Sequence, residues 1–221
     1  MIPDFPVAIL AGGMATRLRP VTETIPKALV EVAGEPFVSH QLKLLRRQGV
    51  RRVVLCVAYR GEMLREYVGN GGRWGLEVEW SFDGEKLLGT GGALKRALPL
   101  LGEEFLVLYG DSYLPCDLER VVQAFRQGGS PALMTVFRNH GQWDTSNVEY
   151  RDGRIVRYDK KHPGPAMQHI DYGLGAFRLE VFRDLPGDEP VDLAEVYRDL
   201  AGRGALAAGE VAERFYEVGS F

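Results

Sequence analysis

Two glycines and two basic residues near the N-terminus have the types and spacing of a phosphate-binding site. Gly12 and Gly13 come directly after an apolar run, Val7 to Ala11, which predicts a buried strand. Glycines at such a break let the backbone approach a ligand and direct its N–H groups toward an anion. Arg17 and Lys27 follow, ten residues apart, and a guanidinium and an ammonium can hold one anion from two sides. The segment therefore predicts a polyphosphate site.

The spacing excludes the commonest phosphate-binding signatures. The chain has no Gly-Lys dipeptide and hence no Walker A loop, and no G-x-G-x-x-G follows a predicted strand. A glycine-rich turn with solvated basic residues would not explain a Pro-Lys pair at this register. The segment instead resembles the signature of the sugar-1-phosphate nucleotidyltransferases, roughly G-G-x-x-T-R-L-x-P-x-T-x-x-x-P-K-x-L-V-x-V. The matching residues are Gly12, Gly13, Thr16, Arg17, Leu18, Pro20, Thr22, Pro26, Lys27, Leu29, Val30 and Val32.

The resemblance implies transfer of a nucleoside monophosphate from a nucleoside triphosphate to a sugar 1-phosphate, with release of pyrophosphate. A sugar 1-phosphate is already an anionic nucleophile, so the reaction needs no Ser/His or Cys/His pair. Positioned cations would be the main catalytic groups, and the resemblance assigns catalytic roles to Arg17, Lys27 and Lys160. The residues implied to contact the nucleotide through the first loop are Ala11, Gly12, Gly13, Met14 and Thr16.

A carboxylate after a second strand indicates a metal ion. Asp111 follows the predicted strand Phe105–Tyr109, and ligands of open parallel sheets lie at the carboxyl ends of the strands. Asp111 would therefore share a crevice with the Gly12 loop. A carboxylate beside a polyphosphate is repulsive unless a cation lies between them, which predicts Mg²⁺. The resemblance implies a second ligand from a late D-x-G-[ST] element, which here begins with Glu217 in place of the aspartate of many relatives.

Two further segments resemble the family's substrate loops. The first, Glu85 to Gly92, resembles the loop around the nucleobase and implies contacts from Glu85, Gly89, Thr90 and Gly91. The second resembles an E-K pair followed by an N-x-G strand, and Lys160 would hold the sugar phosphate unless the register slips to Lys161. The residues implied to contact the sugar are Asn147, Asp159, Asp171 and the backbone near Tyr172.

The choice of substrates stays open at the level of sequence. Guanine presents two adjacent N–H donors on one edge, whereas uracil and thymine present one donor between two acceptors. The acceptor-only carboxylate of Glu85 therefore favours guanylyl transfer. The short chain and its segments GTGGALKRA and FYEVGS resemble small bacterial enzymes that act on heptose, mannose or N-acetylmuramate 1-phosphate. The alternatives are uridylyl or thymidylyl transfer to another sugar 1-phosphate (N-acetylmuramate 1-phosphate included), transfer to a non-sugar phosphate, and a regulatory relative that binds nucleotide-sugars without catalysis.

The elements that would position these residues follow an alternation of strand and helix. Apolar and alternating runs predict strands, and 3.6-residue spacing predicts helices; the rhythm predicts an α/β fold with a doubly wound, mainly parallel, Rossmann-like sheet. The predicted strands are Val53–Tyr59, Leu76–Phe82, Phe105–Tyr109 and Ala132–Phe137, and the predicted helices are Val38–Gln48, Gly61–Val68, Gly91–Pro99 and Leu118–Gln127.

The rhythm changes near Asn147. A turn at Asp152-Gly153 predicts a β-hairpin in the C-terminal half. Hexapeptide repeats of an appended β-helix are missing, so we expect a single domain, 1–221, with the nucleotide bound by about 1–140 and the sugar phosphate by about 141–221. The later predicted elements are strands at Tyr172–Arg178 and Phe215–Val218 and a helix at Leu193–Leu200.

Composition agrees with a compact cytoplasmic enzyme domain. The 221 residues are 45% hydrophobic, enough for a sizeable core. A net charge of −3 with scattered basic residues argues against nucleic acid, and no run approaches the length of a membrane span or a signal peptide. Cys56 and Cys116 are far apart, which suits a reducing cytosol. The sequence leaves open whether the chain forms a homo-oligomer.

Overall fold

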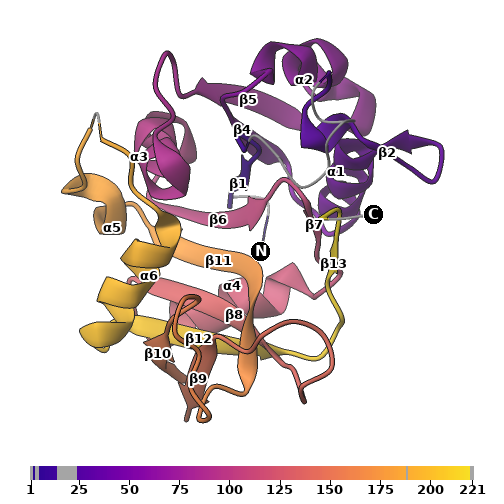
Figure 1. Ribbon diagram of the computed structural model, residues 1–221. Helices are drawn as coiled ribbons and strands as arrows, with labels where there is room; N and C mark the ends of the chain where they lie inside the picture. The colour runs from indigo at the N-terminus through magenta and orange to yellow at the C-terminus, as the bar shows by residue number, and fades with distance from the viewer. Residues whose placement is uncertain (1, 3–4, 14–23, 188, 220–221) are drawn as a thin grey trace.

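The computed structural model describes residues 2, 5–13, 24–187 and 189–219. Met14, Thr16 and Arg17, three of the residues predicted to contact the triphosphate, lie outside this part of the chain. The described residues form one nine-stranded sheet with helices against both faces, and two small two-stranded sheets (Figure 1).

The N-terminal half of the sheet is parallel. Strand β1 (Val7–Leu10) lies between β4 (Arg52–Val57) and β6 (Glu104–Tyr109), and β5 (Glu77–Phe82) pairs with β4 at the edge. All four residues of β1 are buried, as expected for a strand with helices on both faces. Because all four strands run the same way, their carboxyl ends lie along one edge.

The C-terminal half of the sheet is mixed. Strand β11 (His169–Arg178) runs antiparallel between β6 and β8 (Ala132–Arg138). Strand β12 (Leu206–Val211) is parallel to β8, and the hairpin of β9 (Val148–Arg151) and β10 (Arg154–Tyr158) completes the order. An additional pairing of β9 with β11 closes these five strands into a ring.

The predicted α/β class is confirmed, but the sheet is mixed and not mainly parallel as predicted. An apolar run reports that a strand is buried and carries no information about its direction, so β11 could not be oriented from its pattern. The hairpin is confirmed, with both turn residues, Asp152 and Gly153, in the left-handed region at φ 47° and 77°. Strand β12 was not predicted, because its sequence LAAGEV is rich in Ala and Gly, which have low strand propensity.

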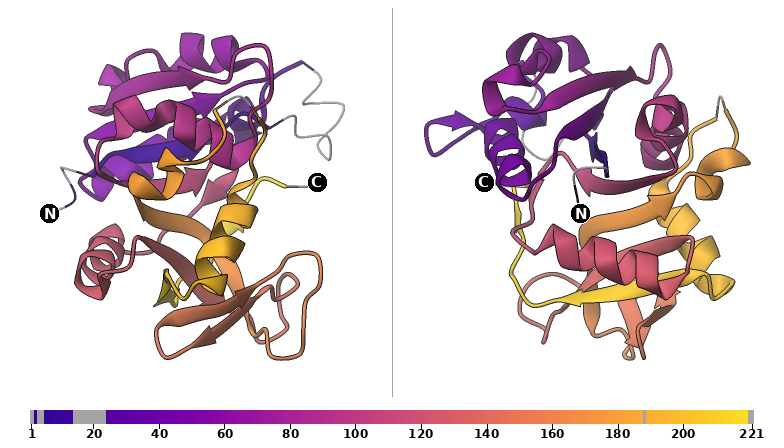
Figure 2. Two further views of the ribbon diagram at one scale, coloured as in Figure 1. Left: turned by 90° about the vertical axis from the view of Figure 1, so that its left-hand side faces the viewer. Right: turned by 180° about the vertical axis from the view of Figure 1, so that it is seen from behind.

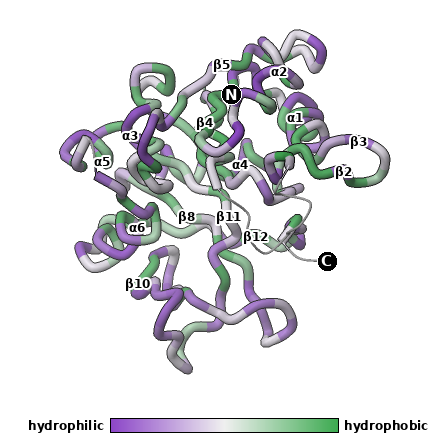
Figure 3. The backbone as a smooth tube through the Cα atoms, turned by 45° about the horizontal axis from the view of Figure 1, so that its top comes forward, coloured by the Kyte–Doolittle hydropathy of each residue, from purple (hydrophilic) through white to green (hydrophobic). Residues whose placement is uncertain are grey.

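Within the described ranges, six α-helices cover the two faces of the sheet, and Figures 1 and 2 show how they are arranged. Alternate residues of β1 enter different cores: Val7 and Ile9 pack on one side, and Ala8 and Leu10 on the other. In Figure 3 the strands at the centre are largely white to green, whereas purple lies mainly on outer helices and loops. The first face is covered by α1 (Phe37–Arg47), α2 (Gly61–Val68) and α4 (Leu118–Gly128), and the second by α3 (Gly89–Leu101), α5 (Glu180–Arg183) and α6 (Leu193–Gly202).

A close backbone approach fixes the start of α3. The N–H groups of Gly91 and Gly92 both donate to the Val191 carbonyl, at 2.8 and 3.3 Å. Gly89 has φ +70°, and a Cβ there would lie 2.5 Å from the Val191 oxygen. A side chain at Gly89 would therefore be unfavourable for two reasons, backbone strain and collision with the Val191 carbonyl. Close packing against this backbone accounts for the glycines of the segment GTGG.

The C-terminal segment returns to the N-terminal half of the sheet. Strand β13 (Tyr216–Glu217) pairs antiparallel with β7 (Ser112–Tyr113), which follows β6 (Figure 1). The other small sheet pairs β2 (Glu31–Val32) with β3 (Glu35–Pro36). Among the described residues, no helix has the length and apolar character needed to cross a membrane.

Candidate active site

A pocket of about 440 Å³ opens at the carboxyl ends of β1 and β6. It is bounded by the loop after β1, the start of α3, the turn after β6 and the C-terminal segment. Of the predicted site residues, Ala11, Gly12, Gly13, Lys27, Gly89, Thr90 and Asp111 line it; the other lining residues are Leu10, Ala28, Cys56, Asp83, Leu87, Ala93, Tyr109, Gly110 and Gly219. The prediction that the Gly12 loop and Asp111 share one crevice is confirmed.

Two glycines allow the strand ends to come this close. The Gly110 N–H donates to the Leu10 carbonyl at 2.9 Å, and a Cβ on Gly110 would lie 2.9 Å from the Cβ of Ala11. A Cβ on Gly12 would lie 3.2 Å from the Cβ of Ala58. Small residues at these points leave the backbone of the loop exposed to the pocket.

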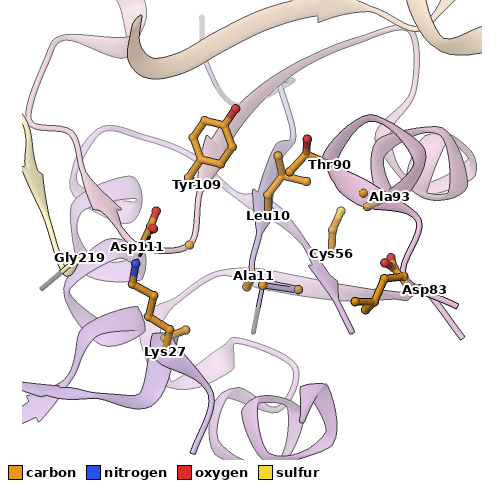
Figure 4. Close-up of a pocket in the computed structure, with 16 residues that line it drawn as sticks. Leu10, Ala11, Lys27, Cys56, Asp83, Thr90, Ala93, Tyr109, Asp111 and Gly219 are labelled. Carbon is orange, nitrogen blue, oxygen red and sulfur yellow. Dashed lines mark hydrogen bonds and ion pairs between the residues drawn. The ribbon is translucent and has the colours of Figure 1, made fainter. Parts of the chain in front are cut away.

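Lys27 and Asp111 form an ion pair at one end of the pocket. Lys27 begins a short 3₁₀ turn, Lys27–Leu29, and its Nζ lies 2.7 Å from Asp111 Oδ2. Only 15% of the Lys27 side chain and 33% of the Asp111 side chain are exposed, so the pair is partly shielded from water. Figure 4 shows the two side chains pointing toward each other, with Cys56, Asp83 and Ala93 at the opposite end.

Glu217 is held next to Asp111 by the backbone. It pairs with Ser112 in the β7–β13 register, and the Val218 N–H donates to the Asp111 carbonyl at 2.9 Å. Although Glu217 is exposed overall, nearby protein atoms desolvate its carboxyl and raise its pKa, and the negative charge of Asp111 raises that pKa further.

These two carboxylates fit a hard divalent cation, which prefers oxygen ligands and relieves the repulsion between them. The pairing of Glu217 with Ser112 and the hydrogen bond from the Val218 N–H to the Asp111 carbonyl bring the segments that carry both carboxylates to one place. Among the described residues there is no group of three or more His, Cys, Asp or Glu side chains suited to a metal.

The other end of the pocket contains a carboxylate that the sequence analysis missed. Asp83 directly follows β5, and its Oδ2 accepts the Leu88 N–H at 2.9 Å. Burial raises its pKa. Burial and then the charge of Asp83 raise the pKa of the Cys56 thiol to about 12, so Cys56 is no nucleophile at neutral pH. The signal for Asp83 was available, because it follows a predicted strand in the same way as Asp111.

Only some of the residues predicted to surround the nucleobase, in the segment Glu85 to Gly92, lie at the pocket. Gly89 and Thr90 line the pocket, and Thr90 Oγ1 accepts the Leu193 N–H at 2.7 Å. The Gly91 N–H is used by the Val191 carbonyl. Glu85 is exposed and does not line the pocket, so its predicted contact with the base gains no support.

A second cluster brings together residues predicted to bind the sugar phosphate. Lys160 Nζ lies 3.4 Å from Asp171 Oδ2, and the Tyr158 hydroxyl donates to the same oxygen at 3.0 Å. The Lys160 ammonium also lies 5.6 Å from the ring centroid of Tyr158 and 5.8 Å from that of Tyr109. Because Tyr109 lines the pocket, this cluster adjoins the Asp111 end.

Asn147 belongs to the same cluster. Its Oδ1 accepts the Asp171 N–H at 3.0 Å, and Asp171 Oδ1 in turn accepts the Gly173 N–H at 3.0 Å. The side chain of Asp171 is 4% exposed, so these contacts hold an almost buried carboxylate. The structure thus brings Asn147, Lys160 and Asp171 together, although they come from three separate segments.

Two other predicted sugar-binding residues have their side chains engaged elsewhere. Tyr172 is buried in the core, where its ring packs edge-on against Phe215. Asp159 Oδ1 accepts the N–H groups of Lys161 and His162, both at 2.9 Å, and the bond from His162 is the largest cause that lowers the pKa of Asp159 to about 2. Asp159 therefore stabilises the turn that follows it, and Tyr172 can offer a ligand only its backbone.

Tyr109 connects the two clusters and was not predicted. Burial raises the pKa of its phenol well above the usual value, and the charge of Asp171 contributes next, followed by those of Asp192 and Asp111. The hydroxyl is therefore neutral at physiological pH and available as a hydrogen-bond donor. The sequence could have indicated this role, because Tyr109 is the last residue of β6 and directly precedes Gly110-Asp111.

Comparison with known proteins places these features in a family. Residues 7–150 match the family model described as "Nucleotidyl transferase". The chain is 32% identical over 217 residues to mannose-1-phosphate guanylyltransferase catalytic subunit beta of Danio rerio, covering 96% of this chain and 60% of that protein. It is 28% identical over 202 residues to D-glycero-alpha-D-manno-heptose 1-phosphate guanylyltransferase of Campylobacter jejuni, covering 90% and 89%.

Some relatives are considerably longer than this chain. It spans 52% of the UTP–glucose-1-phosphate uridylyltransferase of Synechocystis, with 30% identity over 204 residues. Among solved structures, HddC of Yersinia pseudotuberculosis in complex with GMP-PN has a TM-score of 0.80 at 24% identity and covers 97% of this chain and 94% of that one. A glucose-1-phosphate thymidylyltransferase structure from Bacillus anthracis, described as putative, has a TM-score of 0.84 at 19% identity, covering 98% and 90%.

The structural likenesses show that the fold is shared. The family match covers most of the chain and includes both the glycine loop after β1 and Asp111 after β6. The chain belongs to the nucleotidyl transferase family.

Proposed function

We propose that the protein transfers a nucleoside monophosphate from a nucleoside triphosphate to a sugar 1-phosphate, releasing pyrophosphate. The observation that carries this proposal is the arrangement around Asp111. A glycine loop suited to phosphates lies on one side, and a partly exposed lysine, Lys160, held over Tyr109 by Asp171, lies on the other. Two anionic substrates could therefore meet between separate cations, which is the main requirement of phosphoryl transfer.

The described residues divide into two roles under this proposal. Backbone N–H groups at Gly12 and Gly13 would bind the triphosphate together with Arg17, which lies outside the described residues. Lys27 would neutralise charge that develops at the reacting phosphate, and Lys160 would hold the sugar phosphate. The described pocket contains no nucleophilic Ser or His, and its cysteine is protonated at neutral pH, in agreement with direct attack by the sugar phosphate.

Asp111 and Glu217 are the residues that would hold Mg²⁺. A bound Mg²⁺ would reduce the repulsion between the two phosphates and stabilise charge as it shifts between them. Lys27 binds Oδ2 of Asp111, so the lysine and the cation would compete for this carboxylate. Glu217 contributes the second charge; desolvation is the main cause of its raised pKa, and the negative charge of Asp111 raises that pKa further.

Guanine is the base that the pocket favours. The carboxylate suited to its two adjacent N–H donors is Asp83, which lines the pocket, and not Glu85, which does not. Asp83 Oδ2 accepts the Leu88 N–H with one lone pair, so Oδ1 and the second lone pair of Oδ2 would be the acceptors for the two donors of guanine. The relatives that act on mannose and heptose 1-phosphates as guanylyltransferases support the same choice.

The two parts of the chain correspond to the two substrates in this proposal. Residues of about 1–140 would bind the triphosphate and supply most of the pocket lining, and residues of about 141–221 would contribute Lys160, Asp171 and the second carboxylate. We place the reaction in the cytoplasm, because Cys56 and Cys116 are both free thiols and free thiols suit a reducing compartment.

A substrate panel tests the reaction. Pyrophosphate release should be measured for GTP, UTP, dTTP and CTP, each with mannose, heptose, glucose and N-acetylmuramate 1-phosphates and with a non-sugar phosphate. We expect turnover with GTP and a mannose or heptose 1-phosphate, and none in Asp111→Asn. Turnover only with a non-sugar phosphate would contradict the sugar assignment, and binding of a nucleotide-sugar without any turnover would indicate a regulatory protein.

A pair of variants tests the metal assignment. Because charge matters more than one methylene when a flexible ion bridges two groups, Glu217→Asp should keep more activity than Glu217→Gln at every Mg²⁺ concentration. Full activity in Glu217→Gln would remove this residue from the metal site. Equal loss in both variants would mean that the geometry of the carboxylate, and not its charge, is limiting.

A further inference from the structure

The amide side chain of Gln41 binds the backbone on both sides of the Asp111 turn. Gln41, in the middle of α1, is 2% exposed. Its Nε2 donates to the Tyr109 carbonyl at 2.9 Å and to the Ser112 carbonyl at 2.8 Å. These two carbonyls lie on either side of Gly110-Asp111, so a single NH₂ group ties together the chain entering and leaving the turn.

The same amide also bears on the second carboxylate. Ser112 is the residue of β7 that pairs with Glu217 of β13, and the Val218 N–H donates to the Asp111 carbonyl. Holding the Ser112 carbonyl therefore fixes the short strand against which Glu217 is placed. Through two hydrogen bonds, Gln41 sets the positions of both segments that carry the proposed metal ligands.

Hydrogen bonding fixes the orientation of the Gln41 amide, with its nitrogen and not its oxygen facing the two carbonyls. Both N–H donors of Gln41 meet carbonyl oxygens, and a flipped amide would turn its own oxygen against them. Gln41 Oε1 is buried and has no hydrogen-bond partner among the described residues. A buried acceptor without a partner is unfavourable, and the fold accepts it here while keeping both donors on the turn.

Helix α1 is also anchored to the segment that carries Lys27. The Phe37 N–H, at the start of α1, donates to the Val30 carbonyl at 2.9 Å, just after the turn Lys27–Leu29. The helix thus spans from the lysine segment to the Asp111 turn. We infer that Gln41 is a positioning residue, which holds Asp111 and, through Ser112, Glu217 in the geometry that binds the divalent cation.

The inference rests on the proposed metal site, and α1 supplies a matched control. Gln48, seven residues later at the C-cap of α1, makes an analogous two-bond clamp: its Nε2 donates to the Cys116 carbonyl at 2.7 Å and its Oε1 accepts the Leu118 N–H at 2.9 Å. That clamp holds the chain between β7 and α4, beyond the Asp111 turn. A general loss of helix packing should affect both variants, whereas loss of metal geometry should affect only Gln41.

The experiment compares Gln41→Leu with Gln48→Leu in the full chain. Mn²⁺ alone should be titrated and followed by electron paramagnetic resonance, and kcat, KM and the Mg²⁺ dependence of turnover should be measured. Residues that orient metal ligands typically change affinity or activity by about 10- to 100-fold. We expect a loss of this size in Mn²⁺ affinity and in kcat for Gln41→Leu, with KM for the sugar phosphate unchanged, and near wild-type values for Gln48→Leu.

A second variant covers the case in which Gln41→Leu does not fold. Gln41→Asn keeps the donors but is one methylene shorter, so it should hold the two carbonyls less tightly than glutamine, and it should show a smaller loss of Mn²⁺ affinity at a near wild-type melting temperature. Equal effects in the Gln41 and Gln48 variants, or unchanged Mn²⁺ binding in both Gln41 variants, would overturn the inference. Wild-type protein that binds Mn²⁺ but turns over no substrate pair would instead contradict the proposed function alone.

Discussion

Lys27 Nζ lies 2.7 Å from Asp111 Oδ2, although the two residues are 84 positions apart in the chain. The contact joins the segment after the glycine loop to the turn after β6. It also gives one carboxylate two roles, because the oxygen that binds the lysine belongs to the side chain proposed to bind Mg²⁺. Lys27 is therefore placed between the proposed triphosphate site and the metal site.

Replacing Lys27 should distinguish its effect on the reaction from its effect on Mg²⁺ binding by Asp111. In Lys27→Met the charge that stabilises the transition state is lost, and kcat should fall on the order of 10²-fold or more. The Mg²⁺ concentration for half-maximal activity should not rise, because Asp111 is released from a competing cation. Initial rates over a range of Mg²⁺ concentrations measure both quantities. A variant with unchanged kcat and an increased Mg²⁺ requirement would show that Lys27 serves the metal site and not the reaction.

The two neighbouring lysines should behave differently. Lys160 contacts Asp171 and lies over Tyr109, whereas Lys161 is an exposed residue whose backbone N–H binds Asp159. Lys160→Ala should raise the KM for the sugar 1-phosphate at least about tenfold, the effect of losing ~1.4 kcal/mol of binding, while Lys161→Ala should change it little. Calorimetric titration with each substrate separately tests this without turnover. The reverse result would move the phosphate contact to Lys161.

Replacing Gly89, at the edge of the pocket, should destabilise the protein far more than replacing Gly129, which has a similar backbone conformation but lies elsewhere. Gly129, at the end of α4, has φ +66° and open space around its Cβ position, whereas a Cβ on Gly89 would meet the Val191 oxygen at 2.5 Å. Gly129→Ala should cost about 1–2 kcal/mol of backbone strain, and ~1 kcal/mol lowers Tm by about 2–4 °C in a domain of this size. Gly89→Ala should lower Tm by at least twice as much as the control. Equal melting temperatures would mean that the Val191 segment moves aside freely.

The buried carboxylate of Asp83 should make stability depend on pH. Because burial raises its pKa above the ordinary value of 3.8, its contribution to stability is full below that value and is lost as pH rises through the folded-state pKa. Asn stays neutral and can still accept the Leu88 N–H. The melting temperature of Asp83→Asn relative to wild type should therefore increase from about pH 4 to about pH 7. Arg96 donates to the Asp83 carbonyl at 3.0 Å, and its charge lowers the pKa of Asp83. A difference that falls over this range would mean that Arg96 compensates the ionised carboxylate.

The same variant separates stability from specificity. If Asp83 contacts the base, Asp83→Asn should lose preference for GTP even where it melts at a higher temperature, since functional groups are often retained at a cost in stability. Unchanged selectivity among the four triphosphates would mean that Asp83 does not contact the base and serves only to bind the Leu88 N–H. The substrate panel and a melting curve are sufficient for this comparison.

Local patterns predicted the parts of the fold that depend on near neighbours. Helix α2 has the predicted bounds, Gly61–Val68, because its apolar spacing and flanking residues are all local. The crevice shared by Gly12 and Asp111 was also predictable, since each follows a buried strand and parallel strands end on the same side. Asp83 obeys the same rule, but the resemblance to the family's base loop pointed to Glu85, two positions later.

The sequence by itself determined the α/β class, the glycine loop after β1 and the carboxylate after β6, because strand burial and chain breaks are encoded within a few residues. Only the tertiary structure decided the direction of β11, the parallel pairing of β12 with β8 and the contact of Lys27 with Asp111. It also decided that Lys160, and not Lys161, lies over Tyr109. The physical reason is that an apolar run buries equally well in either strand direction, so long-range packing chooses the order of the strands and which distant side chains meet at their ends.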